Sequence, residues 1–293
     1  MRSSGVSASS LSPAAWLAAL LPSLVPNQPL QPKGGGPPTV AATVLAEYPH
    51  DPYAFTQGLH YEPRTQTLLE STGLYGGSTC RRVDIKSGKV LACEHLEPDH
   101  FGEGLSVDGT TLLQLLWRVG LCLVRDATTL RCRRVLPLPI GMREGWGLTS
   151  DGAGAFWASD GSSTLHELDA RSLEVRRTVQ VRVGGRALPS INDLQWVDGI
   201  LLANIWRQDR LAAIDPDTGE VRAFVDLSNL LPPGERRRLG PEEVLNGIAY
   251  DPSGGGAEDA SEDGGGDMMG GCLYVTGKCW PKLFKVRLPR LVM

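Results

Sequence analysis

The sequence predicts an all-β protein, a five-bladed β-propeller, and three observations carry this prediction. A short segment that closes on an aliphatic residue recurs as FTQGL, FGEGL, GWGL, NDL and NGI. Each copy is followed by a turn and a strand-like run, with no sustained helical periodicity. Radial repeats of four-stranded sheets have a period of about 40 to 50 residues. The steps here are 46, 43, 46 and 54 residues between the closing positions Leu59, Leu105, Leu148, Leu194 and Ile248.

The outer strands of the first four blades follow in order along the chain. After each recurring segment come three strand-like runs, separated by turns rich in Gly, Asp or Thr. These runs occupy 67–72, 79–85 and 89–96 in the first repeat, 111–117, 121–126 and 130–138 in the second, 155–160, 164–169 and 174–181 in the third, and 200–206, 210–215 and 220–227 in the fourth.

The fifth repeat has runs at 272–278 and 282–287 but never supplies a fourth strand. An unassigned strand at 39–48 precedes the first repeat. We therefore expect this N-terminal strand to complete the last blade, because closure leaves no open sheet edge at the seam. The Gly-rich, acidic stretch 254–271 interrupts the fifth repeat and is predicted to be a disordered insertion.

The five repeats occupy residues 41–290 of the 293 without a break, which indicates one propeller domain. The net charge of −4 is small and interleaved, which argues against a nucleic-acid partner. No apolar stretch approaches the roughly 20 residues that span a bilayer, so no membrane partner is expected for the mature domain. We expect a monomer.

Residues 1–40 differ from the rest, with an apolar run between Pro13 and Pro22 and no acidic residue before Glu47. This pattern resembles a cleaved targeting segment. It predicts a secretory, extracellular or vacuolar location, with a plastid as the alternative.

The six cysteines form no CxxC pair, so a thiolate zinc site is not expected. Cys80 with Cys93, and Cys122 with Cys132, fall on neighbouring strands where disulfides are conceivable in an oxidising compartment. Free, buried cysteines are the favoured interpretation.

Equivalent positions of the blades should meet at the central axis. The residues before each closing Gly-Leu step form a first ring of one carboxylate, three amides and one indole, an unusual set for packing: Gln57, Glu103, Trp146, Asn192 and Asn246. A second ring at the ends of the second strands consists of Ser71, Trp117, Asp160, Trp206 and Lys278. Together the rings predict an aromatic pocket.

Glu103 is the candidate for proton transfer in this pocket. Among indole rings the carboxylate loses hydration, so we expect its pKa to rise towards neutrality. A turn cap or an ion pair with Lys278 is the structural alternative. No histidine falls in the rings, so neither a His relay nor a His-ligated metal is predicted.

The strings FTQGL, ESTGLYGGS, FGEGL, EGWGLTSDG, NIW, VLNGIAYD and VTGKCWPKLF, taken in this order, resemble the plant-type and bacterial glutaminyl-peptide cyclotransferases over residues 44–288. That family forms five-bladed propellers with a central cavity and is unrelated to the zinc-dependent animal enzymes. The sequence departs from the family pattern at Asp193, where the family usually carries glutamate, and in the 254–271 insertion.

The resemblance implies that a peptide or protein with an N-terminal glutamine is converted to its pyroglutamyl form with release of ammonia, without cofactor or metal. It implies that Glu103 transfers the proton. The substrate pocket would be lined by Phe55, Gln57, Trp117, Trp146, Asn192, Trp206 and Lys278, with Asn246 as a further hydrogen-bonding residue.

Two other functions remain open from the residues. A propeller lactonase would hold a divalent cation at the axis through oxygens such as those of Glu103, Asn192 and Asn246, although Trp146 and Gln57 suit a metal poorly. A propeller that binds peptides without catalysis is the other alternative, because the scaffold does not by itself decide function.

Overall fold

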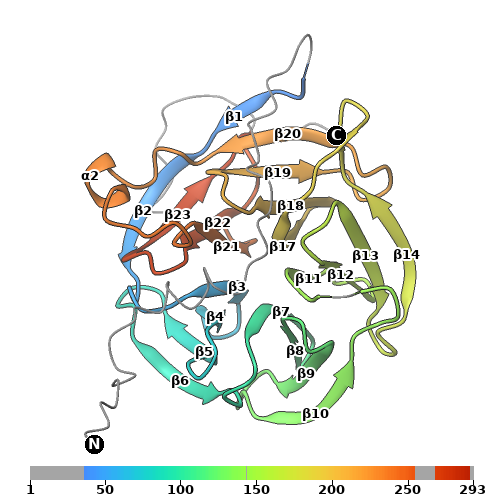
Figure 1. Cartoon of the computed structure of the whole chain (residues 1–293). Helices are drawn as coiled ribbons and strands as arrows, with labels where there is room; N and C mark the ends of the chain where they lie inside the picture. Colours follow the sequence, from blue (N-terminus) through green and yellow to red (C-terminus); the bar gives the residue numbers. More distant parts are fainter. Residues whose placement is uncertain (1–35, 143, 255–267, 291–293) are drawn as a thin grey trace, which may run out of the picture.

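The computed structural model describes residues 36–142, 144–254 and 268–290. Five sheets surround a central axis, and the innermost strand of each comes from the recurring segment (Figure 1). These strands are β3 (Thr56–Glu62), β7 (Gly102–Asp108), β11 (Leu148–Ser150), β17 (Ile191–Val197) and β21 (Leu245–Asp251). The predicted five-bladed propeller is confirmed.

The other strands follow outward in chain order and agree closely with the predicted runs. They are β4 (Thr67–Thr72), β5 (Thr79–Asp84) and β6 (Val90–His95) in blade 1, β8 (Thr111–Leu116), β9 (Leu121–Asp126) and β10 (Cys132–Pro137) in blade 2, β12 (Ala155–Ser159), β13 (Thr164–Asp169) and β14 (Val175–Gln180) in blade 3, β18 (Ile200–Ile205), β19 (Arg210–Ile214) and β20 (Val221–Asp226) in blade 4, and β22 (Cys272–Gly277) and β23 (Lys282–Arg287) in blade 5.

The N-terminal strand closes the ring as predicted. β2 (Thr43–Pro49) pairs antiparallel with β23 and becomes the outer strand of blade 5. The predicted run 39–48 is nevertheless two strands, because β1 (Thr39–Ala41) pairs in parallel with β20 of blade 4. The segment therefore holds two blades together across the top of Figure 1. Its start at Thr39 lies inside the segment 1–40 that was expected to stay outside the fold.

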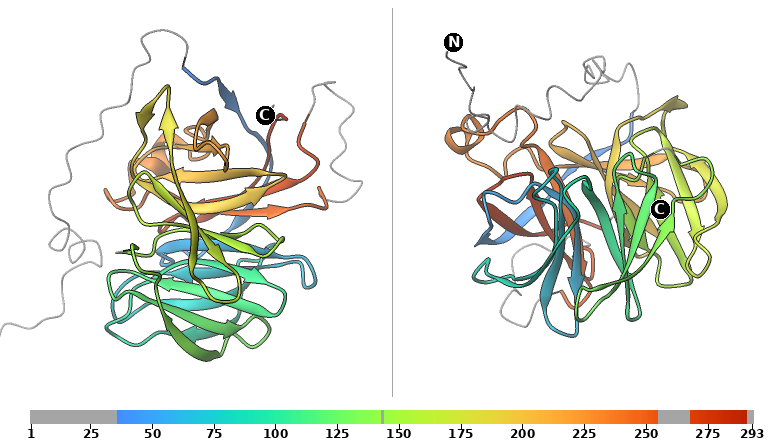
Figure 2. Two further views of the ribbon diagram at one scale, coloured as in Figure 1. Left: turned by 90° about the vertical axis from the view of Figure 1, so that its right-hand side faces the viewer. Right: turned by 60° about the horizontal axis from the view of Figure 1, so that its bottom comes forward.

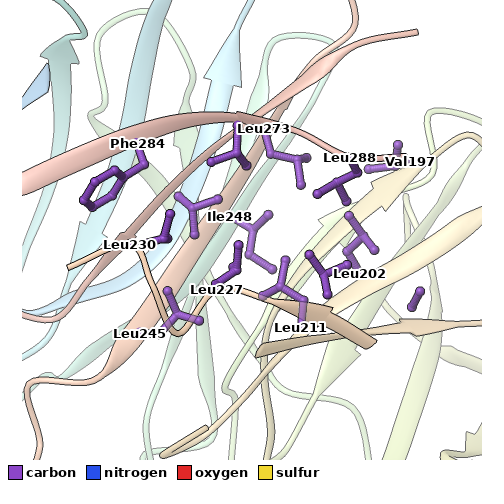
Figure 3. Close-up of a cluster of buried hydrophobic side chains, with 14 of the residues drawn as sticks. Val197, Leu202, Leu211, Leu227, Leu230, Leu245, Ile248, Leu273, Phe284 and Leu288 are labelled. Carbon is purple, nitrogen blue, oxygen red and sulfur yellow. The ribbon is translucent and has the colours of Figure 1, made fainter. Parts of the chain in front are cut away.

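The core is divided into apolar layers between neighbouring blades. The layer between blades 4 and 5 has Ile248 and Leu202 at its centre and Phe284 at one side (Figure 3). Similar clusters fill the four other interfaces between adjacent blades. Figure 2 shows from two further sides that the sheets pack face to face around the axis. Each blade therefore depends on both neighbours for its buried surface.

Two short elements lie outside the four-stranded pattern. The hairpin β15 (Arg182–Val183) and β16 (Arg186–Ala187) precedes blade 4, and the helix α2 (Pro233–Arg236) lies in the loop that enters blade 5. None of the helices in the described part of the chain is long and apolar enough to cross a membrane.

The predicted insertion 254–271 falls largely on residues 255–267, which lie outside the described residues. Its C-terminal end is ordered, contrary to the prediction. The backbone N–H of Met269 donates to the Leu288 carbonyl at 3.0 Å, and Met268 pairs with Pro289. These contacts bring the end of the insertion to the end of the propeller.

The described cysteines are free, as favoured from the sequence. Cys80 lies opposite Glu94 and not opposite Cys93, so the side chains of Cys80 and Cys93 point to opposite faces of the sheet. Cys93 and Cys132 are exposed, so the expectation that the cysteines are buried fails for these two.

Candidate active site

Bulges aim the first-ring side chains at the axis. In four blades the pairing of the innermost strand shifts register at the ring residue, namely at Thr56/Gly58, Gly102/Leu105, Ile191/Leu194 and Leu245/Ile248. A bulge inserts an extra residue and redirects its side chain. In blade 3 the ring residue Trp146 precedes β11, and its N–H donates to the Ser159 carbonyl at 2.9 Å.

In blades 1, 2 and 3 the glycine after the ring residue is explained by the close approach of the inner strands. A Cβ at Gly58 would lie 2.6 Å from the backbone nitrogen of Leu105, and one at Gly104 would lie 2.5 Å from the Trp146 carbonyl oxygen. A Cβ at Gly147 would lie 2.1 Å from the Asn192 carbonyl oxygen. The recurring Gly-Leu step is thus the contact between one blade and the next.

The two rings enclose a pocket at the axis. Its lining residues are Gln57, Phe101, Glu103, Trp117, Trp146, Asn192, Trp206, Glu242 and Lys278. The structure thus brings together seven of the nine site residues predicted from the sequence and adds Phe101 and Glu242.

Aromatic rings form the walls of this pocket in two groups. Trp117 packs on Phe101 with 5.3 Å between ring centroids, and Trp206 meets Trp146 edge to face at 6.0 Å. Phe55 is not among the lining residues. It packs behind Phe101 at 6.3 Å and lies 4.9 Å from the Lys278 Nζ. Phe55 therefore supports the pocket without lining it.

Glu103 is 4% exposed and lies beside an amide and an ammonium group. Its Oε1 accepts a hydrogen bond from Gln57 Nε2 at 3.3 Å. Burial raises the pKa of Glu103 well above its usual value, against the attraction of Lys278 and with the repulsion of Glu144 and Asp193. Burial also lowers the pKa of Lys278, and Glu103 opposes that shift. The predicted direction for Glu103 is confirmed.

Two asparagines of the first ring differ in their roles. Asn246 does not line the pocket. Its Nδ2 donates to the backbone carbonyls of Thr56 and Gln57 at 3.1 and 3.2 Å and to the Gln57 Oε1 at 3.3 Å, which orients the Gln57 amide towards Glu103. Asn192 does line the pocket, and within the described part its Oδ1 has no hydrogen-bond partner. Asn192 therefore carries a buried acceptor without a donor at the wall of the pocket.

Comparisons with known proteins identify the family of this chain. The sequence pattern described as glutamine cyclotransferase matches residues 16–288. The chain belongs to the glutamine cyclotransferase family. It is 39% identical over 249 residues to a glutaminyl-peptide cyclotransferase of Arabidopsis thaliana, covering 84% of this chain and 70% of the relative. The crystal structure of Myxococcus xanthus glutaminyl cyclase superposes with a TM-score of 0.73 at 33% identity, over 86% of this chain and 98% of that one.

Membership in the cyclotransferase family favours the first of the three functions considered from the sequence. Among residues 36–142, 144–254 and 268–290, no group of three or more His, Cys, Asp or Glu side chains is placed to hold a metal ion.

The departure from the cyclotransferase pattern at Asp193 lies behind the pocket. Asp193 occupies the position that glycine holds in the other blades, and its Oδ2 accepts the backbone N–H of Ile248 at 3.0 Å. The side chain is completely buried, and burial raises its pKa well above the usual value. Asp193 therefore bridges blades 4 and 5.

The prediction that Ser71 belongs to the second ring was wrong. The turn after β3 is two residues longer than the turn after β7, so Gly73 and not Ser71 follows the strand end that matches Trp117. Ser71 is buried and accepts from Gln114 at 2.7 Å. A Cβ at Gly73 would lie 2.1 Å from the Phe101 ring, so Phe101 takes the space that a side chain would need.

Asp160, the other polar member of the second ring, does not line the pocket. Its Oδ1 accepts from the Ser162 hydroxyl at 2.6 Å, and its Oδ2 lies 3.1 Å from His166 Nε2. It stabilises the turn after β12.

The two lining residues that were not predicted differ in their sequence signal. Phe101 holds in FGEGL the place that Phe55 holds in FTQGL, so the repeat itself carried the signal. Glu242 lies in the irregular loop before β21, where no repeat places it.

Proposed function

We propose that the protein converts the N-terminal glutaminyl residue of peptides or proteins to pyroglutamate, with Glu103 as the proton-transfer residue. The observation that carries this proposal is the contrast between the two carboxyl groups of the pocket. Glu242 is paired with Arg207, whereas Glu103 is buried against an amide and has a raised pKa. A group that titrates nearer neutrality is suited to take up and return a proton.

The reaction joins the substrate's α-nitrogen to its own side-chain carbon. The α-amine attacks the γ-amide carbon, the new C–N bond closes a five-membered ring, and the bond to the amide nitrogen breaks. Glu103 as a carboxylate accepts a proton from the attacking amine and then delivers it to the departing nitrogen, which leaves as ammonia. One carboxyl group thus returns to its starting state in each turnover.

The other lining residues hold the reacting groups. In this proposal the Oδ1 of Asn192 accepts a hydrogen bond from the substrate's amine or amide N–H, and its lack of a partner among the described residues supports this role. Lys278 supplies positive charge next to Glu103 for the oxyanion that develops on the amide oxygen. Trp117, Trp146 and Trp206 contact the glutamine methylenes and exclude water.

The nucleophile is the substrate's own α-amine, and this explains why a pocket with one proton-transfer residue suffices for the reaction. Attacking and leaving groups belong to one residue, so the protein mainly has to hold the folded-back conformer. The stiff aromatic walls supply that restraint.

Replacement of the proposed proton carrier tests the function directly. We expect Glu103→Gln to lower kcat on a Gln-initiated peptide by about 100-fold or more, because general acid–base catalysis contributes about that much. Mass spectrometry follows the loss of one ammonia from the peptide. Glu167→Gln, on the outer part of blade 3, is the control and should keep wild-type activity. Near-normal turnover of a folded Glu103→Gln variant would exclude the proposed role.

We also propose that the mature domain acts as a monomer, without a nucleic-acid or membrane partner. Light scattering of the purified chain measures its mass and tests the first point. The predicted secretory or plastid targeting segment lies mainly in residues 1–35, outside the described residues, so the location stays a prediction.

A further inference from the structure

The carboxylate of Glu144, which is not among the lining residues, accepts hydrogen bonds from two tryptophans of the pocket wall. The indole N–H of Trp117 donates to Glu144 Oε2 at 2.7 Å, and the indole N–H of Trp146 donates to the same oxygen at 2.9 Å. Trp117 follows β8 of blade 2, whereas Trp146 precedes β11 of blade 3. Glu144 therefore ties together aromatic rings from two neighbouring blades.

An arginine completes this arrangement on the other oxygen. Arg118 Nε donates to Glu144 Oε1 at 3.2 Å, and its guanidinium lies 3.9 Å from the centroid of the Trp117 ring. Arg118 has a φ of 61°, a conformation that non-glycine residues adopt at a cost of about 1 kcal/mol or more. In this arrangement the guanidinium lies over the indole face, where a cation and an aromatic ring attract each other.

A second arginine–tryptophan contact occurs two blades further on. Arg207 has a φ of 63°, lies 4.4 Å over the ring of the Trp206 that precedes it, and pairs with Glu242 from the loop entering the next blade. The positive φ itself belongs to the propeller backbone, because Leu74, Gly161 and Cys279 adopt it at the matching positions of the other blades. Blades 2 and 4 share an arginine that packs over a tryptophan of the pocket wall.

We propose that Glu144 is a positioning residue for the cyclisation, fixing the indoles of Trp117 and Trp146 as the walls that fold the glutaminyl side chain onto its own amine. This proposal rests on the proposed function and deepens it. Glu144 acts through the two rings and does not itself line the pocket.

The chemistry of the carboxylate explains why glutamate occupies this position. Its two oxygens accept all three donors, and neither has a hydrogen that would oppose an N–H. An amide at the same place would turn its NH₂ towards either Arg118 or the indoles. Trp146 is also confined from behind, because a Cβ at Gly161 would lie 2.6 Å from its ring. With Glu144 removed, the indole N–H groups lose their acceptor and the rings regain rotational freedom.

Glu144 also acts on Glu103 through its charge. Its repulsion contributes to the raised pKa of Glu103, together with that of Asp193 and against the attraction of Lys278. Loss of the charge should therefore move the acid limb of the pH profile of kcat/KM to lower pH. A role limited to folding stability would leave that limb in place.

Kinetics of two variants provide the first test. We expect Glu144→Ala to lower kcat/KM by about 10- to 100-fold, in the range that misplacement of groups around a substrate costs. Glu144→Gln, which keeps one oxygen for the indoles, should lose less, while its acid limb shifts to lower pH. The matched control is Glu167→Gln, which alters a Glu–Arg pair beside the buried Trp157 on the outer part of blade 3.

The indole N–H resonances provide a test that needs no substrate. In ¹⁵N-tryptophan-labelled protein, Glu144→Ala should shift the N–H signals of Trp117 and Trp146, which lose a charged acceptor, while Glu167→Gln leaves these two in place. A folded Glu144→Ala variant with kcat/KM within about twofold of wild type would overturn the proposal. If that variant does not fold, unmoved indole signals and an unmoved acid limb in Glu144→Gln would overturn it.

The two tests also separate this proposal from the proposed function. A wild-type chain that cyclises no Gln-initiated peptide would refute the function, whereas the indole signals would still report whether Glu144 holds the two rings.

Discussion

At the scale of single residues, the pocket contains one polar side chain, Asn192, that the fold buries without fully pairing it among the described residues. Asn192 is 2% exposed, and its Oδ1 has no partner among the described residues. A buried amide without a partner costs free energy in the unliganded protein. Such a cost is consistent with a ligand that supplies the missing donor.

We expect Asn192→Ala to lower kcat/KM by about 10- to 100-fold, because a hydrogen bond to the bound substrate is worth about 1–3 kcal/mol in a dry site. Steady-state kinetics on a Gln-initiated peptide measures the change. Asn229→Ala, in an exposed loop, is the control. A variant with wild-type kcat/KM would show that Asn192 makes no contact with the substrate.

At the scale of elements, the bulged inner strands and the glycines beside them position the site. The bulge turns each ring residue to the axis, and the glycine allows the next blade to approach. The backbone of one blade therefore touches the carbonyl of the next, as Gly147 does with Asn192. Site geometry and blade packing share the same contacts.

Gly147→Ala tests this coupling. The new Cβ would lie 2.1 Å from the Asn192 carbonyl oxygen, so one of the two strands must move. We expect a loss of about 1–3 kcal/mol in the free energy of unfolding, typical of overpacking, together with reduced kcat/KM. Denaturant unfolding and kinetics measure both. In the control Gly234→Ala, the added Cβ meets open space. Unchanged stability in Gly147→Ala would contradict the close approach.

At the scale of the whole molecule, the ring is closed by a strand pairing and by a buried ionic network. His50, directly after β2, contacts the Trp280 carbonyl through Nδ1 at 2.7 Å and Glu70 Oε1 through Nε2 at 3.0 Å. Both partners are acceptors, an arrangement that favours the doubly protonated imidazole. Arg81 Nε donates to the other oxygen of Glu70 at 2.8 Å. The network joins blade 5 to blade 1.

This network predicts how stability depends on pH. Burial alone would lower the pKa of His50, but Glu70 outweighs it and raises the pKa above 6.5. The contribution of His50 is therefore complete below pH 6.5 and is lost as the pH rises through the folded-state pKa. Burial would raise the pKa of Glu70, but His50 and Arg81 lower it from 4.5 to about 2. Its contribution is present above pH 4.5 and is lost as the pH falls towards 2.

We expect Glu70→Gln to reduce the free energy of unfolding by about 3–5 kcal/mol, because it leaves His50 and Arg81 buried without their counter-charge. The variant should also lose the decline in stability that the wild type shows as the pH rises above the His50 range. Unfolding curves across a pH series measure both effects, with the exposed Glu97→Gln as the control. Parallel pH dependences for Glu70→Gln and wild type would contradict the ionic closure of the ring.

The propeller, its blade count and its closing strand could be read from the sequence, because each blade repeats the same strands and turns. The two rings followed from rotational symmetry, which brought Glu103, Gln57 and three indoles to one point without knowledge of the contacts. Prediction from the repeat failed where the lengths of the turns and loops differ between blades. The longer turn after β3 moved the second ring from Ser71 to Gly73, and the irregular loop before β21 concealed Glu242.

Periodic sequence signals report which residues are equivalent, because equivalence is a local property of strands and turns. Contacts between blades are not local. The clamp of Glu144 on Trp117 and Trp146, the support of Gln57 by Asn246 and the His50–Glu70 closure join segments whose distance is set by the ring as a whole. For that reason the position of the site followed from the order of the residues, whereas its internal hydrogen bonding and electrostatics required the packed molecule.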